Sequence, residues 1–185
     1  MRVIAGFLKG RRLKAPTWDG LRPTSDKLRE TLFNILAPRM AGARVLDGYA
    51  GTGAVGIEAL SRGAAHVTFV ESDRRAETLI GENLAHCGVE SGYAIIRATV
   101  ARAIDQLDAA AFGPYALFDI VWFDPPYDEQ PDAVIAVAGV LIAPGGVLVL
   151  EHARRRQAPE AAGRLAQVRQ VTSGDSALSF YELKN

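Results

Sequence analysis

The sequence has few of the residues that mark a secreted, metal-binding or membrane-embedded protein. Cys87 is its single cysteine, which excludes an internal disulfide and any zinc site built on cysteines. His66, His86 and His152 are scattered without the spacing of metal ligands, so we predict no metal site. No apolar run is long enough to cross a bilayer, and the N-terminus lacks the apolar core of a signal peptide. These absences predict a cytoplasmic location.

The chain also has no formal net charge, but its charges are distributed unevenly. Residues 1–44 hold ten lysines and arginines against three acids, so this segment carries +7 and the remainder −7. A basic segment on an otherwise acidic chain indicates a polyanionic partner, because each phosphate neutralised by Lys or Arg releases counterions. An ordinary solvated surface is the alternative. We expect a basic β-hairpin or arm over residues 1–23, followed by the globular domain, residues 24–185.

What the chain does have is a regular alternation of apolar strands and helical patterns. With 185 residues, 49% of them hydrophobic, it can fill one core. Five strands, four of them followed by helical patterns, predict a mostly parallel sheet with helices on both faces, an α/β fold. We expect these strands at 43–47, 66–71, 93–96, 118–124 and 147–151. Residues 164–171 and 177–183, separated by a polar turn, predict a closing antiparallel hairpin, which makes seven strands.

A helix is predicted directly after the basic arm. Thr24 or Ser25 should cap its start, and Pro38 should end it. The apolar residues recur at helical spacing and form one buried stripe. Arg29 falls on the opposite side, where we expect solvent.

The stretch from Phe118 to Tyr127 ends an apolar strand at an acid, two prolines and an aromatic ring. Proline pushes the preceding residue into an extended conformation, so Asp124 should end the strand at the edge where α/β sheets bind ligands. The Asp124 carboxylate and the Pro125 carbonyl could accept N–H bonds from an exocyclic amine of a nucleobase and aim its lone pair at an electrophile. Tyr127 offers a flat face for an unstacked base. We therefore predict a catalytic loop of Asp124, Pro125, Pro126 and Tyr127; an acidic turn closed by prolines is the alternative.

A glycine-rich stretch follows the first strand and contains the pattern G-x-G-x-x-G from Gly51 to Gly56. In dinucleotide folds the first glycine follows the strand directly. Here three residues separate Asp47 from Gly51, and an anion beside Asp47 would be disfavoured. S-adenosylmethionine instead brings an ammonium group, a sulfonium and a ribose diol that Glu71 could bind with both oxygens. We predict this cofactor, with a nicotinamide dinucleotide or a purely structural glycine turn as alternatives.

The two motifs should meet at one place in the sheet. In a doubly wound sheet, the strands that end at Asp47 and Asp124 flank the point where strand order reverses. The cofactor loop and the acceptor loop would then share one crevice, with the methyl group directed at Asp124.

Motifs are distributed along nearly the whole chain: Arg22-Pro23-Thr24, Arg29 to Asn34, Leu46-Asp47 with Ala50 to Gly53, Glu58 to Ala64, Asp124 to Tyr127, and Gly174 to Tyr181. Together they resemble the RsmD family, bacterial guanine N2-methyltransferases of small-subunit (16S) ribosomal RNA. The resemblance implies a Rossmann-like class I methyltransferase fold that depends on S-adenosylmethionine. It also implies a guanine of ribosomal RNA, free or in a partly assembled small subunit, as the acceptor.

The resemblance implies further site residues by position. The cofactor site would comprise Arg22, Thr24, Asp47, Tyr49, Gly51, Thr52, Gly53, Glu71, Ser72, Thr99 and Val100. Family members often carry an acid near the adenine after the third strand, where this chain has Arg97-Ala98-Thr99. The Thr99 hydroxyl or the Val100 amide would serve there instead. The RNA would be held by Lys9, Arg11, Arg12, Lys14 and Arg29.

Three other functions stay open at this point. The same acceptor loop serves adenine and cytosine amino-methyltransferases of DNA or RNA, and the glycine pattern allows an NAD-dependent oxidoreductase. A non-catalytic RNA-binding module would leave Asp124 unexplained. We expect a monomer, because no apolar stripe for association is visible.

Overall fold

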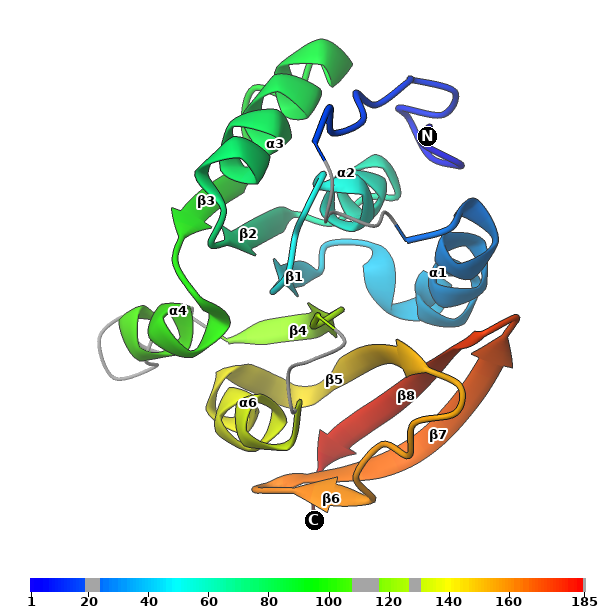
Figure 1. The fold of residues 1–185 in the computed structure, drawn as a ribbon, viewed down its shortest axis with the longest axis vertical. Coiled ribbons are helices and arrows are strands. Elements are labelled where there is room, and N and C mark those ends of the chain that lie inside the picture. The colour runs from blue at the N-terminus through cyan, green and yellow to red at the C-terminus, as the bar shows by residue number, and fades with distance from the viewer. Residues whose placement is uncertain (19–23, 108–116, 127–130, 185) are drawn as a thin grey trace.

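The chain forms a single mixed sheet with helices on both faces (Figure 1). The structure, a computed structural model, describes residues 1–18, 24–107, 117–126 and 131–184. Within them the sheet has eight strands in the order β3-β2-β1-β4-β5-β8-β7-β6. We expected seven. The additional strand is β6 (Ala161–Ala162), which pairs with β7 at the edge and is too short to give a sequence pattern.

Five parallel strands form one half of the sheet. They are β1 (Arg44–Asp47), β2 (His66–Glu71), β3 (Tyr93–Arg97), β4 (Phe118–Phe123) and β5 (Ile142–Ala153). The connecting helices are α2 (Ala54–Ser61), α3 (Arg74–Cys87), α4 (Val100–Gln106) and α6 (Pro131–Ala138), the last continued by the 3-10 helix η2 (Gly139–Leu141). The chain runs outward from β1 to β3 and then returns to pair β4 with the other side of β1. The predicted reversal of strand order is confirmed.

An antiparallel hairpin closes the sheet beyond β5, as predicted. β7 (Leu165–Ser173) and β8 (Ser176–Leu183) pair with each other, and β8 also pairs with β5. The strand β5 begins earlier than expected, at Ile142. Its register with β4 shifts between the pairs Phe118↔Ile142 and Ile120↔Val147, so the residues between them bulge from the ladder.

Helix α1 (Asp26–Met40) begins where the sequence predicted but ends later. Ser25 caps it, because its hydroxyl accepts the backbone N–H of Leu28 at 3.2 Å. Pro38 lies inside the last turn instead of ending the helix. A proline removes only one hydrogen bond, and the burial of Met40 in the core keeps the last turn helical.

Side chains alternate across the sheet between two cores. The face covered by α1, α2 and α3, here called the α2 face, receives Ile120 and Trp122 from β4, whereas the other face, covered by α4 and α6, receives Val121 and Phe123 (Figure 1). This alternation of period two determines on which face each strand-end side chain lies.

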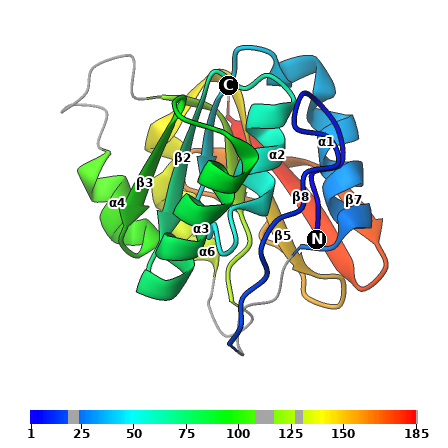
Figure 2. The same cartoon turned by 90° about the horizontal axis from the view of Figure 1, so that it is seen from above.

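The basic arm packs against α1 and α2 (Figure 2). Val3, Leu8 and Leu13 are buried in the same core as the α2 face of the sheet. The predicted hairpin is present as one antiparallel bridge, Arg2↔Arg12, and not as two continuous strands. The expected domain boundary at residue 23 lies outside the described residues.

A buried glutamate on α2 holds the arm in place. Glu58 accepts the backbone N–H groups of Ile4 and Ala5 at 2.7 Å and 2.9 Å. Its carboxylate also accepts a hydrogen bond from Arg62 Nε at 2.8 Å. The arm is therefore fixed through its backbone, which leaves its basic side chains directed outward.

The expectation that Arg29 faces solvent and binds RNA is wrong. Its side chain is fully buried, and its guanidinium donates to the Arg2 carbonyl at 2.8 Å and to Asp26 at 2.6 Å. Another guanidinium nitrogen lies 3.9 Å from the buried carboxylate of Glu58. A buried acid needs compensating charge, and Arg29 supplies it together with Arg62.

Two glycines of the arm provide a matched test of this docking. Gly6 and Gly10 both have positive φ, 82° and 85°, but a Cβ at Gly6 would overlap the Ser61 carbonyl, whereas a Cβ at Gly10 meets nothing. Gly10→Ala should cost only the backbone strain, about 1–2 kcal/mol. Gly6→Ala should cost roughly 1–3 kcal/mol more, because the arm must move off α2. Urea unfolding measures the free energy of unfolding of both variants. Equal losses would contradict the close approach of Gly6 to the Ser61 carbonyl.

Candidate functional site

Three carboxylates stand at the carboxyl edge of neighbouring strands. Glu71 ends β2, Asp47 ends β1, and Asp124 follows β4. The alternation of side chains puts all three on the α2 face. Asp47 pairs with Phe69 and with Trp122, so it lies two residues deeper than Glu71 and Asp124. The structure thus brings the predicted cofactor acids and the predicted catalytic acid together on one edge.

Asp47 is a buried acid beneath the start of α2. Its side chain is 1% exposed, and Oδ2 accepts the backbone N–H of Gly56 at 2.9 Å. Burial raises its pKa to about 7, against a smaller opposing effect of the Gly56 hydrogen bond and with a further rise from the charge of Glu71. Oδ1 is buried and has no hydrogen-bond partner among the described residues. The site therefore offers one unused acceptor that favours a cationic donor.

The loop after β1 contacts the strand that leads to Asp124. The backbone N–H of Gly48 donates to the Trp122 carbonyl at 2.8 Å. A Cβ at Gly48 would overlap the Phe123 ring, so glycine permits this approach. The Tyr49 and Phe123 rings pack edge to face, with their centroids 5.7 Å apart. The predicted cofactor loop and acceptor strand are thus in direct contact.

The same loop is also bonded to β2. Ala50 N–H donates to the Val70 carbonyl at 3.0 Å, and Gly51 N–H donates to Glu71 Oε2 at 2.9 Å. The other Glu71 oxygen accepts the N–H of Asp73 at 2.8 Å. Glu71 therefore holds the loop after β1 with one oxygen and the start of α3 with the other, and each oxygen retains a second lone pair for a ligand.

A buried asparagine that the sequence pattern did not single out joins the loop to the arm. Asn83 of α3 donates to the Thr52 carbonyl at 2.9 Å and accepts the Lys14 N–H at 2.7 Å. The Thr52 side chain is itself buried and lies against Met1, 3.9 Å from its sulfur. Thr52 thus contributes its backbone to the loop, while its hydroxyl faces the arm.

The other predicted site residues occupy the same edge or lie outside the described chain. Ser72 and Thr99 are exposed after β2 and β3, Val100 and Gly53 are buried, and Thr24 is half-buried just before α1. The Thr99 hydroxyl accepts the Arg102 N–H at 3.4 Å and caps α4. Arg22 and Tyr127 are not among the described residues.

A fourth acid at this edge was not predicted to belong to the site. Glu151 lies on β5, next along the sheet from β4, and accepts the Ser176 hydroxyl at 3.2 Å. Ser176 begins β8, so the closing hairpin reaches the edge where Asp124 lies. The signal available in the sequence was the acid at the end of the expected strand 147–151.

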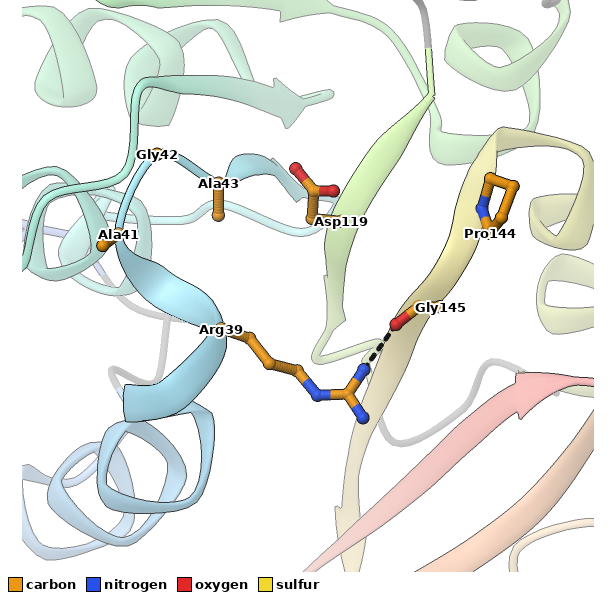
Figure 3. A pocket seen from close by; sticks show the side chains of 7 residues that line it. All are labelled: Arg39, Ala41, Gly42, Ala43, Asp119, Pro144 and Gly145. Atoms are coloured by element: carbon orange, nitrogen blue, oxygen red, sulfur yellow. Dashed lines mark hydrogen bonds between the residues drawn. The ribbon is translucent and has the colours of Figure 1, made fainter.

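A hollow of about 280 Å³ opens at the opposite, amino edge of the parallel strands (Figure 3). Its charged side chains have partners within the protein. Arg39 donates to the Gly145 carbonyl and to Glu182, and Asp119 accepts the backbone N–H of Arg44 at 2.8 Å. These groups stabilise the junction of α1 with the sheet, whereas the predicted site acids lie at the carboxyl edge.

In the described part of the chain, no helix is both long and apolar enough to cross a bilayer. Nor do the described side chains of His, Cys, Asp and Glu form a group of three or more that could hold a metal ion.

A parallel sheet with this order reversal, a glycine loop above a buried acid, and an acid-Pro-Pro sequence after β4 define a Rossmann-like class I methyltransferase. The family model described as "Conserved hypothetical protein 95" matches residues 1–182. The chain belongs to this family, the RsmD family.

Individual relatives agree with this assignment. The chain is 36% identical, over 98% of both proteins, to YlbH of Bacillus subtilis, which is provisionally named an rRNA methyltransferase. It is 44% identical over 127 residues, 69% of this chain and 60% of the relative, to ribosomal RNA small subunit methyltransferase D of Escherichia coli. A solved structure from Escherichia coli, yhhF, provisionally named a methyltransferase, has a TM-score of 0.84 at 32% identity and covers 100% of this chain and 98% of its own.

The buried Asp47 should make stability depend on pH. Its pKa is about 7 in the folded protein against an ordinary 3.8, so between these values only the folded state keeps the proton and the free energy of unfolding falls as pH rises. From about pH 5 to about pH 8 the loss should be roughly 2–3 kcal/mol, at ~1.4 kcal/mol per pKa unit. Asp47→Asn, which keeps an acceptor for Gly56, should lack this component. Urea unfolding at pH 5 and pH 8 measures this loss in both proteins. If the free energy of unfolding falls equally with pH in the wild type and in Asp47→Asn, the prediction is wrong.

Proposed function

We propose that this protein methylates the N2 amine of a guanine in small-subunit (16S) ribosomal RNA with S-adenosylmethionine as the methyl donor. The observation that carries the proposal is the contact of the loop after β1 with β4, through the Gly48 hydrogen bond and the Tyr49–Phe123 ring pair. This contact supports a cofactor loop that lies beside Asp124. The names of the RsmD relatives, which are ribosomal RNA methyltransferases, support the class of acceptor.

The residues present fit S-adenosylmethionine. The unused, buried Oδ1 of Asp47 suits the ammonium group of the methionine end. Glu71 would accept the ribose hydroxyls with its remaining lone pairs, and Thr99 and Val100 would border the adenine. The positive φ of Gly51 and Gly53, 55° and 75°, lets the loop backbone lie close to the ligand. When bound, the cofactor supplies an electrophilic methyl group.

Asp124 and Pro125 would prepare the acceptor amine. The lone pair of the guanine amine is spread into the ring, which makes the amine a poor nucleophile. Acceptance of its N–H bonds by the Asp124 carboxylate and the Pro125 carbonyl draws the nitrogen towards tetrahedral geometry and orients the lone pair. Asp124 then takes the surplus proton. The prolines, which have no N–H, leave this turn to present only acceptors.

The arm would hold the RNA backbone. Lys9, Arg11 and Arg12 are exposed, while the backbone just before them is fixed against α2 through Ile4, Ala5 and Leu8. Lys14 is also exposed and pairs with Glu82 at 3.0 Å. Outward cations on a fixed backbone suit a polyanion, because little ordering is needed when it binds.

Asp124→Ala tests the mechanism. The variant should lower kcat for methyl transfer to small subunits from cells that lack the protein by about 10²- to 10⁴-fold, because the amine loses both its acceptor and its base. Its affinity for S-adenosylmethionine should stay within about twofold, since the proposed cofactor contacts follow β1, β2 and β3 and do not include Asp124. Asp105→Ala, at an exposed acid of α4, is the matched control. An active Asp124→Ala would rule out this role.

Removing the arm's charges tests the RNA contact. The triple variant Lys9→Gln, Arg11→Gln and Arg12→Gln should bind small-subunit RNA more weakly, and the slope of log affinity against log salt should shrink by about 2, at ~0.7–0.9 per phosphate contact. Cofactor affinity should not change. Arg102→Gln, an exposed cation on the other face, is the control. An unchanged salt slope in the triple variant would show that the arm does not contact phosphates.

A further inference from the structure

Glu151 stands beside Asp124 at the carboxyl edge. In the parallel pairing of β4 with β5, Trp122 lies opposite Val149 and Phe123 opposite Leu150, so the next position along each strand brings Asp124 level with Glu151. Trp122 and Val149 belong to the same core, on the α2 face. By alternation both acids lie on this face, on strands about 4.8 Å apart.

Its position places Glu151 on the acceptor side of the site. The cofactor loop is bonded to β2 and β4, whereas β5 lies on the side of β4 away from β1. Glu151 is half-buried, and the Ser176 hydroxyl donates to its Oε1 at 3.2 Å. The carboxylate is therefore oriented by the closing hairpin at a place that a base held over Asp124 would reach.

The atom next to the amine distinguishes guanine from the other bases that carry an amino group. Beside its N2 amine, guanine has N1–H, a donor, on one side and the bare N3 on the other. Beside their amines, adenine has N1 and cytosine N3, both bare lone pairs. An ionised carboxylate only accepts hydrogen bonds, so it attracts the first and repels the other two.

We propose that Glu151 is the specificity-determining residue for guanine: it accepts the N1–H bond while Asp124 binds the adjacent amine. This role rests on the proposed methylation of a guanine N2 amine. It also gives a function to Ser176, which lies in the C-terminal motif and far in sequence from both acceptor strands.

Glu151→Gln should shift the preference of the site from guanine towards 2-aminopurine. Glutamine can donate to a bare ring nitrogen and accept from an amine, which matches 2-aminopurine, a base that keeps the 2-amine but has a lone pair at N1. The substrates are small subunits reconstituted with guanine or with 2-aminopurine at the position that the wild type methylates. Relative to the wild type, the variant should lose about 10²-fold in kcat/KM on guanine and gain about tenfold on 2-aminopurine. Glu160→Gln, at an exposed glutamate, should match the wild type.

The outcomes separate the two proposals. Equal losses on both bases would mean that Glu151 only supports the fold, and an unchanged guanine preference would mean that it does not contact the base; either result overturns the assignment. Cofactor affinity and the urea midpoint of Glu151→Gln show whether the variant is folded. If the wild type itself methylates adenine or cytosine, the product nucleoside reveals it, and the proposed function fails together with the role of Glu151.

Discussion

The pairing of β1 with β4 is the contact on which the arrangement of this molecule depends. The chain turns outward through β2 and β3 before it returns, so Leu46 and Val121 become neighbours although they are far apart in sequence. Their register fixes where both strands end and hence how the loop after β1 meets the turn at Asp124. A slip of one residue would move every side chain of β4 to the opposite face and turn Asp124 away from α2.

Short-range signals account for the parts of the fold that the sequence predicted correctly. Ser25 caps α1 with its own side chain, and the polar turn between β7 and β8 joins neighbouring strands, so each acts within a few residues. Arg29 could not be placed in this way, because its buried partners, the Arg2 carbonyl and Glu58, lie outside its own helix. Helical periodicity predicts that an arginine faces solvent. Only the tertiary structure brings it beside the buried acid that allows its own burial.

The same distinction applies to the site. Asp47 and Asp124 were found because a glycine stretch or a pair of prolines follows them and marks the end of a strand. Glu151 ends the expected strand 147–151, but no glycine stretch or proline pair follows it, and its partner Ser176 comes from the closing hairpin. The burial of Asp47 could not be predicted from the sequence either, because the start of α2 excludes water from its carboxylate only after the helix has packed on the sheet.

Asn83 connects the basic arm to the loop after β1. One side-chain amide binds the backbone of Lys14 in the arm and of Thr52 in the loop. A ligand that immobilises one segment lowers the entropic cost of ordering the other segment when a second ligand binds there. The coupling free energy is the same whichever ligand binds first. If the arm and the loop hold RNA and cofactor as proposed, we expect binding at one to favour binding at the other through Asn83.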